Sequence, residues 1–364
     1  MTSLQDRVRA AAEELVASGA ERGVQVAVYR QGEQVAEVAA GIADPASGRP
    51  VEAGTVFGNY SIGKGATATV VHVLAERGLL GYDTPVAELW PEFAANGKAG
   101  VSVRHVLTHA AGVPGIPAGT TPGDLADRER MCAAIAAAEP WWEPGTAVGY
   151  HSWSFGFVLG EIVRRVTGRS ISEVLAEEVT GPLGVDGELW FGVPAGERHR
   201  LATLEDDPDA GGGPPPPHPR LAEVQPPGVL PTAALGNDPV FVGAEVPSAA
   251  QTSARAIARV YAALLGPVDG VRLIPPDRLR AVTVIAAEGP DQVFGNPSVW
   301  GLGYAIGLPG SDPRATASWF GMPGAGGSLA YADTATGTAL AVTKNRLGDL
   351  ATATRITQIV TRPG

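Results

Sequence analysis

Ser61 and Lys64 are the residues of this chain best suited to chemistry, and they form the tetrad Ser61-Ile62-Gly63-Lys64. The segment 55–60 before them is strand-like, and a helical pattern begins at Ser61. Residues three apart on a helix share one face, with Cβ atoms about 5–6 Å apart. Lys64 is therefore expected beside the Ser61 hydroxyl, near the positive end of the helix dipole. A desolvated lysine has a lowered pKa and can help to remove the serine proton. The pattern predicts a nucleophilic serine, although so short a tetrad also occurs by chance.

Two glycines in the first turns of the same helix support a functional interpretation. Gly63 and Gly65 each cost about 0.8–1.0 kcal/mol of helix stability relative to alanine. Close approach of a substrate or of another loop to the backbone would explain both.

The surrounding segments carry a resemblance to a known family. They are Tyr60 to Lys64, Gly78-Leu79-Leu80, Asp83-Thr84-Pro85-Val86, Trp90-Pro91-Glu92-Phe93, Val103 to Gly112, Trp142-Glu143-Pro144-Gly145, Gly149-Tyr150-His151-Ser152 and Phe155-Gly156. In this order the chain resembles the serine β-lactamase-like enzymes, above all class C β-lactamase-like carboxylesterases (family VIII) and related acyltransferases. The resemblance runs from about residue 20 to 345 and is weakest across 185–245.

The resemblance implies roles for three catalytic residues. Ser61 matches the family's nucleophile, and Lys64 matches the partner that lowers its pKa. Tyr150 matches the tyrosine that acts as general base toward the hydroxyl and general acid toward the leaving group; the alternative is a buried aromatic residue after a turn. Where the family often has asparagine two residues later, this chain has Ser152, a shorter and weaker substrate contact.

The family's third motif, usually Lys-Thr-Gly or His-x-Gly on a strand, corresponds to Met322-Pro323-Gly324. Met322 is neutral and cannot hold a substrate carboxylate, which argues against efficient β-lactam recognition. Ester or amide acyl transfer is unaffected, because an oxyanion hole needs only backbone N–H groups. The resemblance assigns these to Ser61 and Ala325. Taken alone, residues 324–328 are typical of a glycine-rich turn that enters a strand.

Other residues are weaker candidates. Trp153 is one of six tryptophans that could line an acyl or alcohol pocket, although most tryptophans lie in the core. Arg346 follows a strand near the expected cleft and could bind an anionic group, but a solvated surface arginine is more usual. His105 and His109 have a spacing that could hold zinc on a helix, yet no nearby carboxylate completes a site. We therefore expect no metal and no cofactor.

Periodicity and turn signals place further elements along the chain. An N-terminal helix is expected to carry a Thr2–Gln5 capping box and to stop at Gly19. Strands are expected at 24–29, 34–40, 299–306, 328–331 and 338–343, and helices at 61–80, 103–109, 124–138, 153–167, 171–178, 250–265 and 350–360. The Pro- and Gly-rich segment 205–231 is expected to be a loop or lid without helix or central strand.

Composition excludes several classes of protein. The 364 residues include 27 basic and 38 acidic side chains, a net charge of −11, which argues against binding to nucleic acid. A single cysteine, Cys132, excludes an internal disulfide framework and multi-cysteine metal sites. No apolar leader and no run of about 18 apolar residues is visible, so we expect a cytoplasmic protein that does not enter membranes.

The strands at both ends of the chain and the helices between them predict an α+β protein. The resemblance implies a β-lactamase/transpeptidase-like fold, an antiparallel sheet flanked by helices with an inserted, mainly helical domain. We expect the sheet domain at 1–58 and 245–364 and the helical domain at 59–244. The predicted function is hydrolysis of small esters through a Ser61 acyl-enzyme. The alternatives are a transacylase, a D-amino-acid peptidase or amidase, and a non-catalytic binding relative. The sequence does not indicate an oligomeric state.

Overall fold

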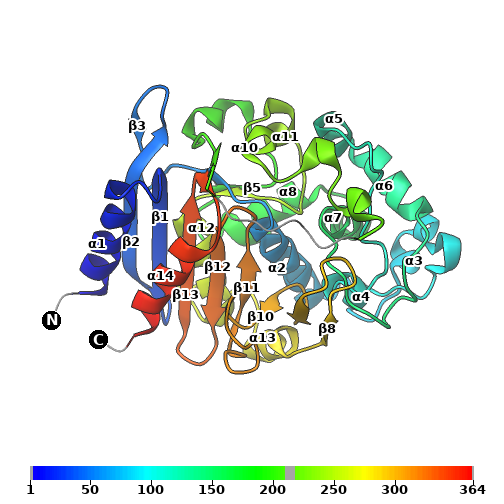
Figure 1. Ribbon diagram of the computed structural model, residues 1–364. Coiled ribbons are helices and arrows are strands. Elements are labelled where there is room, and N and C mark those ends of the chain that lie inside the picture. Colours follow the sequence, from blue (N-terminus) through cyan, green and yellow to red (C-terminus); the bar gives the residue numbers. More distant parts are fainter. Residues whose placement is uncertain (1–2, 210–217, 363–364) are drawn as a thin grey trace.

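A nine-stranded antiparallel sheet, built from both ends of the chain, dominates one side of the molecule (Figure 1). The computed structural model describes residues 3–209 and 218–362. The strand order is β3-β2-β1-β13-β12-β11-β10-β9-β8. The strands are β1 (Gly23–Arg30), β2 (Glu33–Asp44), β3 (Arg49–Pro50), β8 (Ala287–Pro290), β9 (Pro297–Trp300), β10 (Ala305–Ile306), β11 (Trp319–Pro323), β12 (Leu329–Asp333) and β13 (Thr338–Lys344). Val26 of β1 lies opposite Val342 of β13, so the two ends of the chain meet at the middle of the sheet.

Helices cover both faces of this sheet. The helices α1 (Leu4–Ala17) and α14 (Ala351–Thr361) lie side by side over one face (Figure 1). The helix α12 (Ala254–Leu265) packs on β1, β12 and β13 from the other face. Because both faces are covered, all seven residues of β13 are buried, and the middle of the strand, 339–342, is apolar.

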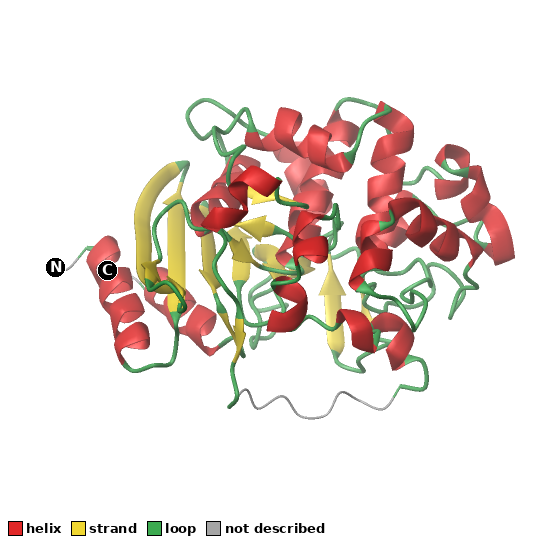
Figure 2. Cartoon of the chain, turned by 90° about the horizontal axis from the view of Figure 1, so that it is seen from above, coloured by secondary structure: helices red, strands yellow, loops and turns green. Residues whose placement is uncertain are grey.

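The remaining helices lie mostly on the other side of the molecule (Figure 2), except that α13 lies below the sheet strands in Figure 1. They are α2 (Ile62–Glu76), α3 (Val86–Leu89), η1 (Pro91–Gly97), α4 (Val103–Leu107), α5 (Pro122–Ala126), α6 (Arg128–Ala137), α7 (Ser154–Thr167), α8 (Ile171–Leu175), η2 (Ala176–Thr180), η3 (Ala195–Arg200), α9 (Leu221–Val224), η4 (Pro227–Val229), α10 (Ala233–Gly236), α11 (Pro239–Gly243) and α13 (Pro276–Thr283). One buried apolar cluster runs from α2 and α7 to α12 and the inner strands. The helical and sheet regions thus share one hydrophobic core. The division into a sheet domain at 1–58 and 245–364 and a helical domain at 59–244 stays a prediction.

Two small sheets join distant parts of the chain. In the first, β7 (Gln251–Thr252) lies between β4 (Phe57–Gly58) and β5 (Leu189–Trp190). In the second, β6 (Glu205–Asp206) pairs in parallel with β14 (Arg346–Leu347).

Several predicted boundaries are corrected. The first helix is capped by Ser3 and Asp6; Thr2 lies outside the described residues, and Gln5 bonds the backbone of Glu37 instead. The predicted helix 61–80 ends at Glu76, and Gly78 continues the chain with φ of 74°. The predicted helix 124–138 is two helices, because Asp127 is non-helical and caps the second one through the Arg130 N–H. The predicted strand 299–306 is likewise two strands, β9 and β10, that pair with each other.

The segment 205–231 contains more structure than expected. It holds β6, α9 and η4, which contradicts a loop without a helix. The run 210–217 lies outside the described residues. The predicted helix 171–178 is α-helical only as far as Leu175 and continues as the π-helical turn η2 to Thr180.

No helix in the described part of the chain has the length and apolar character that crossing a bilayer requires.

Candidate active site

Three predicted catalytic side chains meet at the start of α2. Ser61 is the N-cap residue of this helix, and its side chain makes no capping hydrogen bond. Lys64 Nζ lies 3.2 Å from Ser61 Oγ, and Tyr150 Oη lies 2.7 Å from it. They share a cavity of about 70 Å³ that is also lined by Ser152, Trp153, Gln225, Pro231 and Ala325. The structure thus brings together a hydroxyl, an amine and a phenol, a set of groups that can carry out acyl transfer.

Burial determines the charge of Lys64. The side chain is 1% exposed, and this burial lowers the pKa of Lys64 to about 7. Its ammonium group has two oxygen partners in the structure, Ser61 Oγ and, at 3.3 Å, the carbonyl oxygen of Ser248. Within residues 3–209 and 218–362 no carboxylate pairs with it, so a large share of the lysine is neutral near pH 7 and can accept the Ser61 proton.

Gly63 lets the loop that carries Ser248 approach α2, and Gly65 leaves room for Tyr261 of α12. A Cβ on Gly63 would lie 2.3 Å from the carbonyl carbon of Ala249, and one on Gly65 would lie 2.2 Å from Tyr261 Oη. Close approach by another loop therefore accounts for Gly63, as the sequence suggested. The Ser248 hydroxyl fixes the loop further, because it donates to the Trp153 carbonyl and accepts from the Gly156 N–H.

Tyr150 is held by a residue far away in the chain. Its backbone N–H donates to Asp291 Oδ2 at 2.9 Å, and Asp291 Oδ1 accepts the N–H groups of Val293 and Phe294. Burial raises the pKa of Tyr150 well above its usual value; its hydrogen bond to Ser61 opposes this, and the charge of Asp291 adds to it. The phenol therefore keeps its proton at neutral pH and is suited to donate it.

Two buried histidines support the tyrosine rather than a metal. The ring of His109 lies 4.9 Å from that of Tyr150, and His109 Nδ1 accepts the N–H of His151. Burial lowers the pKa of His151 to about 4 and that of His109 well below its usual value, so both rings are neutral. The helix α4 ends at Leu107 and His109 has φ of 57°, so His105 and His109 do not share a helix face. Residues 3–209 and 218–362 contain no group of three metal-ligating side chains.

The turn after β11 supplies the second predicted oxyanion donor. A Cβ on Gly324 would lie 2.4 Å from the Asn59 carbonyl oxygen, so only glycine lets this turn approach the start of α2. Ala325 then lines the cavity beside Ser61. Within residues 3–209 and 218–362, the N–H groups of Ser61 and Ala325 have no protein acceptor and remain available to a substrate oxygen.

The predicted substrate contacts divide into three groups. Ser152 and Trp153 line the Ser61 cavity. Met322 does not; it is buried with Val148 and Trp300 and lines a neighbouring pocket. Arg346 does not line the Ser61 cavity. Its guanidinium donates to Glu205 and to the Gly19 carbonyl instead. The anion-binding prediction for Arg346 is therefore wrong.

Sequence reasoning missed four residues of the site. Asp291 and Ser248 anchor the catalytic groups, and Gln225 and Pro231 line the cavity from segment 205–231. The proline-rich composition of that segment was the one available signal, and it had suggested a lid.

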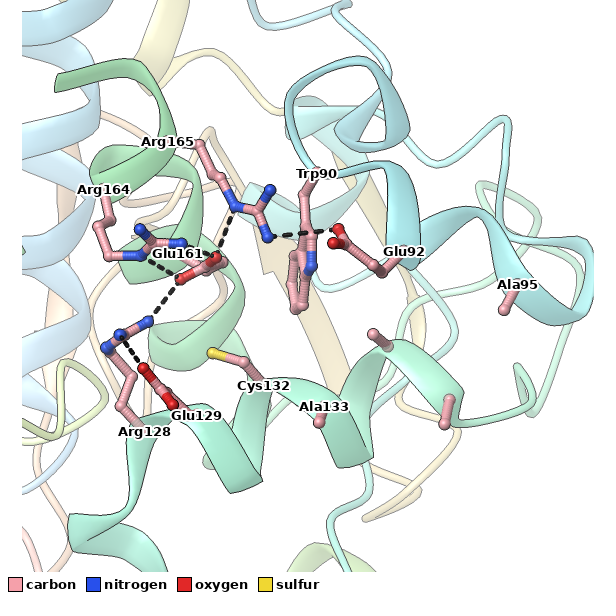
Figure 3. Close-up of a pocket in the computed structure, with 12 residues that line it drawn as sticks. Trp90, Glu92, Ala95, Arg128, Glu129, Cys132, Ala133, Glu161, Arg164 and Arg165 are labelled. Carbon is pink, nitrogen blue, oxygen red and sulfur yellow. Dashed lines mark hydrogen bonds and ion pairs between the residues drawn. The ribbon is translucent and has the colours of Figure 1, made fainter. Parts of the chain in front are cut away.

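A larger cavity, of about 500 Å³, lies among α6, α7 and η1 (Figure 3). Its centre is Glu161, 3% exposed, which accepts hydrogen bonds from Arg128, Arg164 and Arg165. Burial opposes ionisation of this carboxyl, but hydrogen bonds from two of these arginines outweigh it, and the pKa of Glu161 falls below its usual value. None of the catalytic side chains lines this cavity, so we assign the charged cluster a structural role.

Comparison with known proteins decides the family. The model of the family described as "Beta-lactamase" matches residues 8–360. The chain belongs to the β-lactamase family. The nine-stranded sheet with its helices is accordingly the β-lactamase/transpeptidase-like fold expected from the sequence.

Several relatives of this family member are esterases by name. It is 36% identical to "Esterase/beta-lactamase LipL" of Mycobacterium tuberculosis, over 89% of this chain and 77% of the relative. A crystal structure of a family VIII carboxylesterase is 34% identical, with a TM-score of 0.88 over 98% of this chain and 97% of that one. A penicillin-binding protein homologue from Caulobacter crescentus has the same TM-score and identity, over 99% of this chain and 96% of that one. The chain is thus an esterase/β-lactamase-like serine hydrolase.

Proposed function

We propose that this chain is a carboxylesterase that hydrolyses small, uncharged esters through an acyl-enzyme on Ser61. The observation that carries the proposal is the contact of Ser61 Oγ with both Lys64 Nζ and Tyr150 Oη inside a buried cavity. The esterase relatives support it. So does Met322, a buried thioether at the position where the family resemblance implies a lysine or histidine.

In the first half-reaction neutral Lys64 takes the Ser61 proton as Oγ attacks the ester carbonyl. Tyr150 is the weaker base candidate, because its raised pKa leaves little phenolate at neutral pH. The Ser61 and Ala325 N–H groups stabilise the oxyanion. The C–O bond to the alcohol then breaks, and the alcohol oxygen takes a proton from Tyr150, which Lys64 replaces.

In the second half-reaction water attacks the acyl-enzyme, and the same groups act in reverse order. An alcohol or amine in place of water would make the chain a transacylase. Amide substrates would place it with the D-amino-acid amidases. Both alternatives predict the same acyl-enzyme, so the acceptor and the substrate distinguish them.

Intact-mass analysis during turnover of 4-nitrophenyl butyrate tests the proposal. We expect a burst of nitrophenol, a butyryl adduct on Ser61 and release of that adduct in water alone. The Ser61→Ala variant should show neither the burst nor the adduct and should remain folded. An adduct that persists until an amine or alcohol is added would indicate a transacylase. An active Ser61→Ala protein, or a wild-type protein that a serine-directed phosphonate does not modify, would contradict the proposal.

A further inference from the structure

Tyr150 forms part of two cavities at once. It lines the 70 Å³ cavity of Ser61, and it lines a second pocket of about 360 Å³ toward β9, β10 and β11. The second pocket is about twice the size of the roughly 150 Å³ cavity that accepts benzene in an engineered protein core. The Ser61 cavity has room for the ester group itself and little more.

The lining of the second pocket is mainly apolar, with Asn296, Ser298 and Ser311 as neutral polar members. Its walls include Phe294, Val299, Trp300, Leu308 and Met322, and among the described residues no lysine, arginine or histidine lines it. Met322 is 1% exposed and packs against Val148 and Trp300. The wall nearest the catalytic tyrosine is therefore a thioether and an indole, which favour uncharged apolar groups.

The one carboxylate on this wall, Asp291, is already occupied. Its oxygens accept the N–H groups of Tyr150, Val293 and Phe294 and the hydroxyl of Ser298. No lining residue within 3–209 and 218–362 carries a positive charge that could pair with an acidic substrate group, and Asp291 would repel one.

The chemistry of Tyr150 determines which half of the ester faces this pocket. The leaving alcohol oxygen must come within hydrogen-bond distance of Tyr150 Oη in order to receive its proton. The rest of the alcohol then extends from the tyrosine, whereas the acyl group stays on the side of Ser152, Trp153, Gln225 and Pro231. We propose that the pocket beyond Tyr150 binds the alcohol half of the ester, and that the preferred substrates join a short acyl group to a bulky, neutral, apolar alcohol.

This inference rests on the proposed function, and a pair of isomeric esters tests it separately. Phenethyl acetate carries its phenyl ring on the alcohol side, and methyl 3-phenylpropanoate carries the same ring on the acyl side. Both leaving groups are simple primary alcohols, so their intrinsic reactivity is matched. We expect kcat/KM to be at least about tenfold higher for phenethyl acetate, the scale on which a hydrophobic pocket discriminates.

A variant that fills the pocket provides the second measurement. Val299→Trp should reduce the preference for phenethyl acetate over its isomer. Val284→Trp, at a position 59% exposed and outside the pocket, should keep the preference. The isomer comparison uses the unmodified protein, so it decides the matter even where Val299→Trp does not fold.

The outcomes separate the two proposals. Equal rates, or faster hydrolysis of methyl 3-phenylpropanoate, with both reactions lost in Ser61→Ala, would overturn the pocket assignment and leave the esterase proposal intact. Hydrolysis of neither isomer, together with no acyl adduct on Ser61 from 4-nitrophenyl butyrate, would overturn both.

Discussion

Tyr150 Oη lies 2.7 Å from Ser61 Oγ, although the two residues are 89 positions apart in the chain. The contact depends on a third segment, since Asp291 holds the Tyr150 backbone through its N–H. The arrangement thus depends on three segments: Ser61 at the start of α2, Tyr150 before α7, and Asp291 between β8 and β9.

Removal of the Tyr150 hydroxyl should slow the reaction and leave the fold intact. A general acid contributes about 10²–10⁴-fold in rate, so we expect kcat of Tyr150→Phe on an alkyl ester to fall by that factor. The decrease in kcat should be smaller with a nitrophenyl ester, whose leaving group needs no proton. Steady-state kinetics on ethyl butyrate and on 4-nitrophenyl butyrate measure the two decreases. Tyr29→Phe, which removes a hydroxyl on β1 that donates to Gln34 of β2, is the matched control and should keep wild-type rates.

The lowered pKa of Lys64 predicts the pH dependence of the enzyme. Below about pH 7 the lysine is protonated and cannot accept the Ser61 proton, whereas above it the amine is neutral. We therefore expect kcat/KM for an uncharged ester to rise with pH through about 7 and then to level off. Lys64→Arg, whose side chain stays charged, should be inactive across the range. A wild-type profile that rises only near the ordinary lysine pKa would contradict this role.

An added methyl group at Gly63 should damage both stability and catalysis. The new Cβ would overlap Ala249, and overpacking of this kind costs about 1–3 kcal/mol. Displacement of the loop would also move the Ser248 carbonyl away from Lys64, so kcat should fall in the molecules that do fold. Chemical denaturation and kinetics of Gly63→Ala test this. Gly100→Ala is the control, because a Cβ there meets nothing within 4 Å, and its stability should change by no more than about 0.5 kcal/mol.

Neutralisation of Glu161 should affect stability alone. Glu161→Gln leaves three partly exposed guanidinium groups close together without the carboxylate that they share. We expect the free energy of unfolding to fall by about 1–3 kcal/mol. The folded-state pKa of Glu161 is lowered, so its stabilising contribution is present above its ordinary pKa of 4.5 and is lost as pH falls through the folded value. The stability difference between wild type and variant should therefore shrink in acid. Thermal unfolding from pH 3 to 7 measures it, and a change in kcat at pH 7 would contradict the structural role.

What the sequence could predict depended on how local each signal was. Ser61 and Lys64 are three residues apart on one helix, so their contact follows from helix geometry alone. Tyr150 needed the family resemblance, since no local pattern places it beside Ser61. The glycines Gly63 and Gly65 signalled close approach, but their partners, Ala249 and Tyr261, are visible only in the fold.

The predictions that failed depended on partners far away in the chain. Arg346 looked available in the sequence because Glu205, 141 positions earlier, gave no sign of pairing with it. Asp291 belongs to no recognisable motif. Its role follows from the three backbone N–H groups that its carboxylate accepts, and these are visible only in the fold. Helix boundaries near 80 and 127 shifted because single residues, Gly78 and Asp127, left the helical region of backbone space.

The buried thiol of Cys132, beside Glu161 in Figure 3, has a practical consequence. It is the one cysteine in the sequence, and burial raises its pKa to about 12, so almost none of it is thiolate at neutral pH. Alkylating fluorophores should therefore ignore the unmodified protein and react with a cysteine introduced on the surface. A dye attached in this way on α9 would test whether the segment that carries Gln225 and Pro231 moves when substrate binds, without any need to remove the native residue.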